Sequence, residues 1–502
     1  MKIDLSTHIS KKAPVVILVK SKATFEKHPL LKKLIPADQT YLRVPHVKGR
    51  ISEDAASTAL LLPSGKTLLC IGVGEERAFT HRKSILAMRR VILAAKQEKS
   101  KEVELYLDDF LPRISDGISL TPEETAEAVA LQLELANFDF TSYKTPPKGG
   151  WVHVEKATVV VPSLKASIAN AVKRGKIIGE EINKTRALSN TPGGDMTPAI
   201  LAAAAKRAAK GKGMRVTIFN ERKIKSLKMG GVLGVSKGSA ERPRFIVVSY
   251  LKGKKSEKPV VLVGKGVTFD TGGLNLKSSD HIYDMHMDMS GGAAVIHTIA
   301  ALARLRVKKN LIGLIPAVEN MPSGSSYHPG DLLRTMGGKT IEVLNTDAEG
   351  RVILSDALEY AKRYAPRLVI DIATLTGAAC VALGQRASAL FTTDQKFEKL
   401  LRDTGEKTGD YVWPLPLWEE YEEEIRGTFG DFANLGKTRY GGAITGAVFL
   451  WQFTKNSSGK GQAYPWVHLD IAPRMTTIDG EYLAKGAAGA PVSLLVRLLQ
   501  NF

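Results

Sequence analysis

Short apolar runs alternate with longer helical patterns along the first third of the chain. The runs 14–20 (PVVILVK), 66–74 (KTLLCIGVG) and 101–107 (KEVELYL) are typical of buried strands. Between the last two, residues 81–97 repeat apolar side chains with the period of a helix. This alternation of strand and helix patterns predicts an α/β domain.

A further helix is predicted to begin at Thr121. Pro122 would occupy its first position, and Glu124 is placed to complete a capping box with the Thr121 hydroxyl. The run 156–162 (KATVVVP) then resumes the strand pattern. From residue 163 to residue 188 the periodicity is helical, so we expect one long helix that connects this domain to the next.

The second part of the chain repeats the α/β pattern at greater length. Its strand-like runs are 259–264 (PVVLVG), 311–317 (LIGLIPA), 340–345 (TIEVLN) and 367–373 (RLVIDIA). Helical stretches separate them, which predicts a mostly parallel central sheet covered by helices, with the reactive site at the carboxyl ends of its strands. We therefore expect an N-terminal α/β domain over 1–162, a connecting helix over 163–189 and a larger α/β catalytic domain over 190–502.

Composition narrows the class of protein. The 502 residues are 44% hydrophobic and 24% charged, as in folded globular proteins. Only two cysteines occur, Cys70 and Cys380, so the sequence predicts neither a disulfide framework nor a thiolate zinc site. No window approaches the roughly 18 apolar residues of a membrane span, and the first apolar run is too short for a signal peptide. We expect a cytoplasmic protein without a membrane segment.

Positive charge is concentrated in one segment. The formal net charge is +20, and residues 201–260 hold 16 basic and 3 acidic side chains. Lys206, Arg207 and Lys210 fall on a predicted helix in this segment. Such an excess can hold an acidic partner such as nucleic acid, but it is also typical of the solvated surface of a basic protein. The sequence leaves both interpretations open.

Carboxylates follow the predicted strands of the second domain. The glycine-rich segment after residue 264 contains Lys265, Asp270 and Lys277, and Asp347 and Glu349 follow the run 340–345. Because residues i and i+2 of an extended segment point to the same side, we expect the last two carboxylates to converge. Asp288, just before a predicted helix, can supply a fourth carboxylate.

Four carboxylates at adjacent strand ends repel one another unless cations lie among them. A pair of divalent ions is the usual solution, and bridged ions can activate a water molecule for hydrolysis. Oxygen ligands suit magnesium or manganese, yet zinc also accepts carboxylates. Lys277 and Arg351 are nearby fixed cations that could stabilise an oxyanion. The residues thus predict a metal-dependent hydrolase.

Each of these features also has a structural explanation. A single aspartate after a strand often caps a helix, and a lysine in a glycine-flanked turn is commonly solvated. No glycine-rich phosphate-binding fingerprint follows a strand, so the nucleotide-binding signal is weak. Spacing alone does not separate peptide substrates from phosphate esters.

At these same residues the sequence resembles the leucyl aminopeptidase (cytosol aminopeptidase) family of dinuclear metallopeptidases. The run 345–352 (NTDAEGRV) contains the signature of that family. Further matches are GKGVTFDTGG, DMSGGAA, ENMPSG, HPGD, IDIATLTGA, GGAITGA and WVHLDIA. The resemblance is strong from about Asn190 onward, whereas the first part matches only the α/β pattern of a variable N-terminal domain.

The resemblance implies two metal sites and their ligands. Lys265, Asp270, Asp288 and Glu349 would hold the tighter ion, and Asp270, Asp347 and Glu349 the more exchangeable one. Asp270 and Glu349 would bridge the two. The ions would be Zn²⁺ or Mn²⁺, with Mg²⁺ possible at the exchangeable site. The substrate's free α-amine would bind a metal, which would make the enzyme an exopeptidase.

The resemblance also implies the remaining roles. Lys277 would polarise the scissile carbonyl, and Arg351 would anchor a bicarbonate ion that acts as general base. Met285, Thr374 and Gly377 would line a pocket for an apolar first residue such as leucine. The family assembles as a homohexamer, and some bacterial relatives bind DNA, so both properties become expectations here. The complete ligand set favours a peptidase over a phosphoesterase or a protein that only binds DNA.

Overall fold

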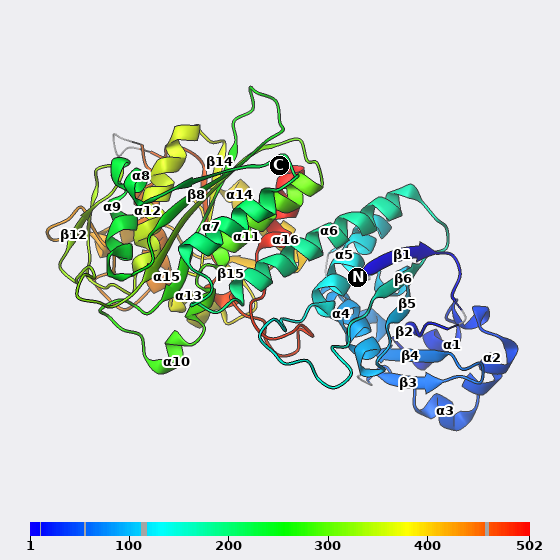
Figure 1. Cartoon of the computed structure of the whole chain (residues 1–502). Helices are drawn as coiled ribbons and strands as arrows, with labels where there is room; N and C mark the ends of the chain where they lie inside the picture. The colour runs from blue at the N-terminus through cyan, green and yellow to red at the C-terminus, as the bar shows by residue number, and fades with distance from the viewer. Residues whose placement is uncertain (11, 55–56, 112–117, 457–460) are drawn as a thin grey trace. The chain divides into compact units, whose positions relative to one another are not determined.

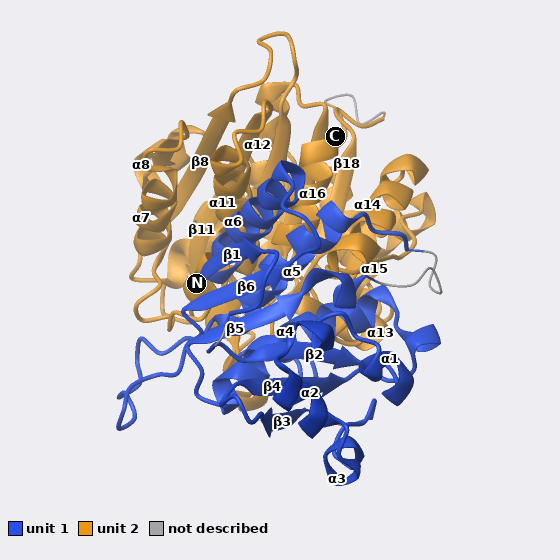
Figure 2. Ribbon diagram, turned by 90° about the vertical axis from the view of Figure 1, so that its right-hand side faces the viewer, with its two compact units in different colours: residues 1–183, 478–485 blue, residues 184–477, 486–502 orange. Residues whose placement is uncertain are grey.

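The computed structural model describes residues 1–10, 12–54, 57–111, 118–456 and 461–502. The chain forms two compact units (Figure 2), the first comprising residues 1–183 and 478–485 and the second residues 184–477 and 486–502. The boundary falls inside one long helix, α6 (Ala166–Ser189). Both units combine helices with sheets whose strands are mostly parallel, which confirms the predicted α/β class.

The first unit is built on a six-stranded sheet. In spatial order its strands are β1 (Lys2–Ser6), β6 (Lys156–Val160), β5 (Glu102–Tyr106), β2 (Val15–Val19), β4 (Thr67–Gly72) and β3 (Thr58–Leu61). All neighbours pair in parallel except β3 and β4. The three predicted strand runs that include β2, β4 and β5 are thus confirmed.

The alternation of side chains along β2 explains why this sheet is buried on both faces. Val16 and Leu18 belong to one hydrophobic core, which includes residues of the helices α4 (His81–Gln97) and α5 (Pro122–Asn137). Val15 and Ile17 point to the other face and belong to a second core. The other helices of this unit are α1 (Lys22–Glu26), α2 (Pro36–Leu42) and α3 (Pro45–Gly49).

Helices α4 and α5 of the first unit each begin with a capping hydroxyl. Thr80 accepts a hydrogen bond from the backbone of Lys83 at the start of α4. At the start of α5, Thr121 and Glu124 form the predicted capping box, and Pro122 is the first helical residue. These local signals fix where the two helices begin, and the capping box at Thr121 was predicted from the sequence.

The second unit contains a nine-stranded mixed sheet (Figure 1). Its strands in spatial order are β16 (Val412–Pro414), β15 (Ser388–Phe391), β18 (Trp466–Asp470), β14 (Leu368–Ala373), β9 (Val260–Gly264), β11 (Asn310–Asn320), β8 (Arg244–Leu251) and β7 (Arg215–Phe219), and β10 (Gly266–Asp270) pairs with the end of β11. The central strands β18, β14, β9 and β11 are parallel. Their carboxyl ends therefore meet at one edge.

Helices cover both faces of this sheet. Val261 and Val263 of β9 pack in the same core as Val352 and Ile353 of α12 (Glu349–Ala361). The other face contacts α11 (Ser290–Arg304), since a side chain at Gly313 of β11 would meet α11. The remaining helices are α7 (Pro198–Ala209), α8 (Glu221–Ser226), α9 (Gly230–Val235), α10 (Ser279–Ile282), α13 (Gly377–Leu383), α14 (Gln395–Thr408), α15 (Gly442–Gln452) and α16 (Val492–Asn501).

One predicted strand of the second unit lies elsewhere. The run 340–345 contributes only β13 (Thr340–Glu342), which pairs with β12 (Leu332–Arg334) and β17 (Phe432–Ala433) in a separate three-stranded sheet. The expectation that this run belongs to the central sheet was wrong.

Among the described residues, no helix has both the length and the apolar composition that a bilayer crossing requires.

Candidate metal centre

Three carboxylates of the second unit come together. Asp270 is the last residue of β10, Glu349 is the first residue of α12, and Asp347 lies two residues before Glu349. One oxygen atom from each of the three lies within 4.8 Å of the others. Ala348, between the last two, has φ −111° and ψ 42°, so the segment is not extended. Asp347 and Glu349 converge because they span a helix start, and the expected i, i+2 strand geometry was wrong.

Lys265 joins this cluster from the end of β9. Its Nζ lies 2.8 Å from Asp288 Oδ2 and 2.9 Å from Glu349 Oε1, and it donates a hydrogen bond of 2.8 Å to the carbonyl of Thr374. A Cβ atom at position 350 would lie 2.8 Å from Lys265 Nζ. Glycine at 350 therefore leaves the room that the buried ammonium group occupies.

Lys277 contacts two other carboxylates of the cluster. Its Nζ lies 2.9 Å from Asp270 Oδ2 and also contacts Asp347 Oδ1. The backbone N–H of Lys277 donates to the carbonyl of Thr271, which closes the loop between them at 2.9 Å. Gly272 and Gly273 have φ of +86° and +65° within this loop, a conformation that side chains disfavour.

The cluster carries more negative than positive charge. Burial raises the pKa of Glu349, and the neighbouring Asp270 raises it further. Burial alone would lower the pKa of the Lys265 ammonium, but the carboxylates of Asp288 and Glu349 outweigh that effect and raise it. Four carboxylates facing two ammonium groups leave a deficit of positive charge, which is the electrostatic condition that divalent cations satisfy.

Several buried carboxylate oxygens of this site face lysine ammonium groups. Among the described residues these are Asp288 Oδ2, Asp347 Oδ1 and Glu349 Oε1, each within ion-pairing distance of Lys265 or Lys277. Carboxylate oxygens that face cations in this way fit the ligands of a divalent metal ion.

Arg351 lies two residues beyond Glu349 and is buried. Burial lowers the pKa of its guanidinium to about 10, against the opposing effect of the Glu349 and Asp470 carboxylates. Its Nη1 donates a hydrogen bond of 3.0 Å to the carbonyl of Asn434, while its Nε has no hydrogen-bond partner among the described residues. The group therefore retains donor capacity that a small anion can use.

The three predicted pocket residues occupy different positions. Thr374 is buried, and its hydroxyl donates a 2.5 Å hydrogen bond to Asp288 Oδ1. The carbonyl of Met285 accepts a hydrogen bond from the backbone N–H of Asp288. Gly377 is exposed at the start of α13, and a Cβ there would meet nothing within 4 Å. The structure thus ties Thr374 to the carboxylate of Asp288 and Met285 to the backbone of Asp288, and it leaves space beside Gly377.

Hydrogen-bonding residues around the carboxylates were missed by the sequence analysis. Asn320 donates from Nδ2 to Asp270 Oδ1 at 2.8 Å. Thr374 was predicted as pocket lining only, although its carbonyl and hydroxyl hold Lys265 and Asp288. A signal for Asn320 was present, because it is a polar residue at a strand end, and the same rule identified the aspartates.

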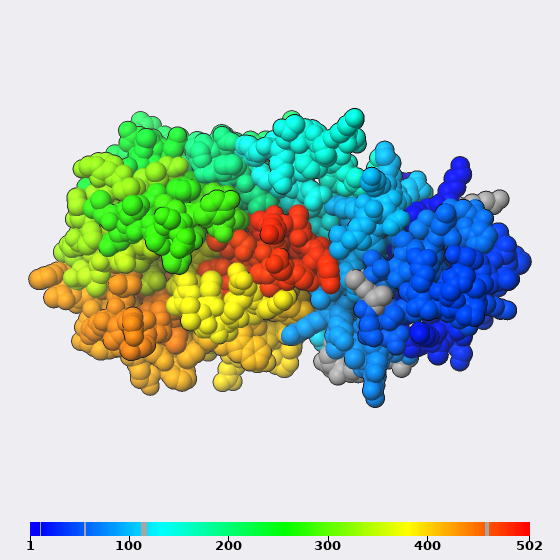
Figure 3. All heavy atoms as spheres, turned by 90° about the horizontal axis from the view of Figure 1, so that it is seen from below, coloured from blue at the N-terminus to red at the C-terminus, as the bar shows by residue number. Residues whose placement is uncertain are grey.

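Figure 3 shows that segments distant in the sequence, near residues 280 and 430, share one face of the second unit.

Comparisons with known proteins show which family the chain resembles. The profile of the cytosol aminopeptidase family, catalytic domain, matches residues 183–496, and that of its N-terminal domain matches residues 46–147. The probable cytosol aminopeptidase of Methylobacillus flagellatus is 39% identical over 476 residues, covering 93% of this chain and 92% of the relative. That of Paraburkholderia phymatum is 41% identical over 436 residues, covering 86% and 83%.

A solved structure shares the whole architecture. The bottromycin maturation enzyme BotP in complex with Mn superposes with a TM-score of 0.81 at 29% sequence identity, covering 98% of this chain and 99% of that one. A second structure of BotP gives a TM-score of 0.79 over the same shares. The likeness therefore extends over both units.

Proposed function

The chain belongs to the cytosol aminopeptidase family of metal-dependent peptidases, and we propose that it releases N-terminal leucine and other apolar residues from peptides with the help of two divalent ions. The observation that carries the proposal is the convergence of Asp270, Asp347 and Glu349 within 4.8 Å beside two lysines. The enzyme is a hydrolase that acts on peptides; the preferred residue and the two-ion mechanism are the proposal.

The residues present divide into two ligand sets. Lys265, Asp270, Asp288 and Glu349 would hold one ion, and Asp270, Asp347 and Glu349 the other. Support comes from the buried carboxylate oxygens that face lysine ammonium groups and from the deficit of positive charge. When bound, the ions supply the Lewis acidity that activates a water molecule for attack on the peptide carbonyl. Zn²⁺ and Mn²⁺ are the candidate ions, with Mg²⁺ a third at the exchangeable site, and the Mn complex of BotP supports manganese.

The chain's own cations have separate roles in this proposal. Lys277 Nζ donates to the oxygen of the scissile carbonyl as negative charge develops there. Arg351 would hold a bicarbonate ion through its unused Nε donor, and that ion would supply the general base. The carboxylates are then not needed as general bases. The tight Asn434 contact fixes the guanidinium in place.

The pocket for the first residue is formed by Met285, Thr374 and Gly377. The hydroxyl of Thr374 is engaged by Asp288, so it does not offer a donor to the substrate. A thioether, a threonine without a free donor and a glycine favour an apolar side chain. We extend the proposal to a homohexamer and to the reducing cytoplasm, where the unpaired Cys70 and Cys380 would stay reduced.

A substrate panel tests this function. Leucyl, alanyl and glutamyl chromogenic amides are compared at equal concentration, together with N-acetyl-leucyl amide as the matched control for the free amine. We expect fastest release from the leucyl amide and no release from the acetylated one. Equal cleavage of the acetylated substrate would contradict an aminopeptidase, and a preference for glutamyl amide would contradict the apolar pocket.

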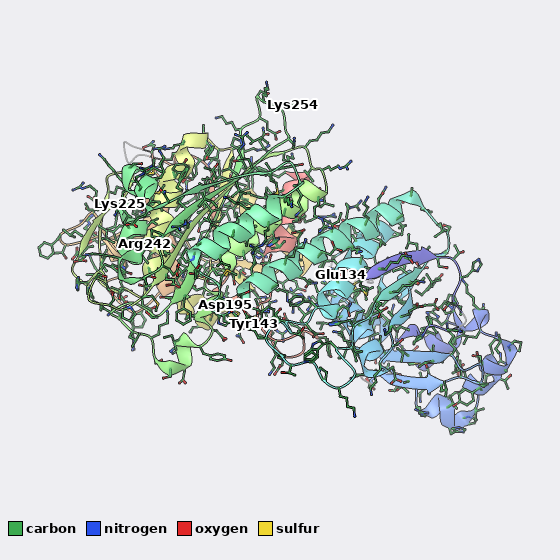
Figure 4. The ribbon with its side chains drawn as sticks, in the orientation of Figure 1. Glu134, Tyr143, Asp195, Lys225, Arg242 and Lys254 are labelled. Atoms are coloured by element: carbon green, nitrogen blue, oxygen red, sulfur yellow. The ribbon has the colours of Figure 1, made fainter. Side chains whose placement is uncertain are left out.

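A second function, nucleic-acid binding, is supported by the basic segment 201–260. Lys206, Arg207 and Lys210 are exposed at the end of α7. Figure 4 shows Lys254 in the loop after β8, projecting away from the sheet. In a fluorescence-anisotropy titration with duplex DNA, affinity should fall with a log–log salt slope of about −0.9 per phosphate contact. Binding that is absent at physiological salt, or unchanged when the three α7 residues become alanine, would remove this function.

A further inference from the structure

Asn320 occupies a position that the metal-binding proposal does not yet use. It is the last residue of β11, and the parallel register pairs it with Asp270, the last residue of β10. Paired residues of parallel strands lie side by side, so the amide stands next to the carboxylate that is proposed to bridge the two ions. Asn320 is completely buried, with 0% of its surface exposed.

The amide group of Asn320 fixes one oxygen of Asp270. Its Nδ2 donates a 2.8 Å hydrogen bond to Asp270 Oδ1, and the backbone N–H of Gly272 donates a second bond of 2.9 Å to the same oxygen. The other oxygen, Oδ2, faces Lys277 Nζ at 2.9 Å. The carboxylate therefore cannot rotate without breaking two hydrogen bonds, and Oδ2 is the oxygen presented to cations.

The same amide reaches the second carboxylate segment. Asn320 Nδ2 also donates to the carbonyl of Thr346 at 2.9 Å, and Thr346 immediately precedes Asp347. The hydroxyl of Thr346 in turn donates to the carbonyl of Gly272 at 2.6 Å. One side chain thus joins the segment of Asp270 to the segment of Asp347 and Glu349.

The two sides of the Asn320 amide differ in their partners, and only its N–H groups are used. Asn320 Oδ1 is buried and has no hydrogen-bond partner among the described residues. Exchanging the amide nitrogen and oxygen would place the oxygen against two acceptors, so the assignment is fixed by its neighbours. A buried unpaired oxygen disfavours folding, which makes asparagine an unfavourable choice for stability alone.

We propose that Asn320 is a positioning residue of the metal centre, which orients the Asp270 carboxylate and holds the two ligand segments at a fixed separation. The inference rests on the proposed function, because it assigns Asp270 as the bridging ligand. Such hydrogen bonds to metal ligands typically contribute about 10- to 100-fold to metal affinity. Asn320→Ala removes both donors, and Asn320→Asp keeps the size but replaces the donors with a further carboxylate.

Tyr327→Phe is the matched control. The Tyr327 hydroxyl donates to the same Thr346 carbonyl at 2.7 Å and is also buried. It lies in the field of the same carboxylates, but among the described residues it donates no hydrogen bond to Asp270. Mn²⁺ binding to the metal-stripped full-length protein is measured by titration calorimetry for all three variants. Thermal melting of the metal-free forms reports folding, and kcat and KM for leucyl amide are measured at limiting and at excess Mn²⁺.

The expected result separates positioning from general stability. Asn320→Ala should weaken Mn²⁺ binding by about 10- to 100-fold and lower kcat at limiting metal, with partial recovery at excess Mn²⁺ and little change in KM. Tyr327→Phe should lower the melting temperature while Mn²⁺ affinity stays within about threefold of wild type. If Asn320→Ala fails to fold, the Asn320→Asp variant carries the same test, with the same expected loss of affinity.

Three results would overturn the inference, and only the last of them also affects the proposed function. Wild-type Mn²⁺ affinity in a folded Asn320 variant, or an equal loss of affinity in Tyr327→Phe, would overturn the positioning role alone. Wild-type protein that binds no divalent metal and still cleaves leucyl amide would overturn the proposed function as well.

Discussion

Lys277→Ala tests the proposed electrophile. The Lys277 side chain is only 13% exposed, and its Nζ lies 2.9 Å from Asp270 Oδ2 in the centre of the carboxylate cluster. A donor held in such a water-poor position stabilises developing negative charge without reorganisation. Losing one typically lowers kcat by about 10²–10³, which corresponds to about 2.7–4 kcal/mol of transition-state stabilisation. KM should change little, because the ground-state carbonyl carries little charge.

The assay must separate this effect from the loss of a buried cation. In the metal-free protein the substitution leaves Asp270 and Asp347 without their neighbouring ammonium group, so the melting temperature should fall. Steady-state kinetics are therefore measured with saturating Mn²⁺ and after metal content has been checked. Lys277→Arg retains the charge and should keep more of kcat than alanine does. A rise in KM with unchanged kcat in Lys277→Ala would refute the electrophile role.

Three further predictions concern other residues. Asp347→Ala and Glu349→Ala should abolish turnover and lower the bound metal per chain, measured by elemental analysis; normal turnover with unchanged metal content would falsify the two-ion assignment. Gly377→Ala should leave the melting temperature unchanged, because the added Cβ would meet nothing within 4 Å. The same substitution should lower kcat/KM for leucyl amide relative to alanyl amide by about tenfold or more. An unchanged ratio would exclude Gly377 from the pocket. Burial lowers the pKa of His468, but the Asp371 carboxylate 2.6 Å away outweighs this and raises it. The folded protein then binds the His468 proton more tightly than the unfolded chain does. The resulting gain in the free energy of unfolding is complete below the ordinary histidine pKa and is lost as pH rises through the raised pKa of the folded protein. The melting temperature of His468→Gln, measured across that pH range, should lack this decline.

The alternation of apolar runs was sufficient to predict the α/β architecture. Local signals such as the Thr121 capping box placed helix starts correctly, because capping depends on residues close in sequence. The run 340–345 was assigned to the wrong sheet, because a short apolar run does not identify its pairing partner. Pairing is decided by tertiary packing.

The candidate site was likewise predicted only in part, because some of its contacts join residues far apart in the sequence. The strand-end rule identified the region of Asp270, the residues themselves suggested that Lys277 stabilises an oxyanion, and the family resemblance supplied the role of Lys265. The support from Asn320 and Thr374 was missed, because Asn320 contacts Asp270 across 50 residues of sequence and Thr374 contacts Asp288 across 86. Such contacts leave no periodic pattern in a single sequence.

The central claim is that the carboxylate cluster binds the ions on which peptide hydrolysis depends. It is tested by stripping the protein of metal and following leucyl amide cleavage as Mn²⁺ or Zn²⁺ is returned in measured equivalents. We predict an inactive metal-free protein, with activity that rises until two equivalents are bound per chain. Full activity in the metal-free protein, or in an Asp347→Ala variant treated in the same way, would contradict the claim.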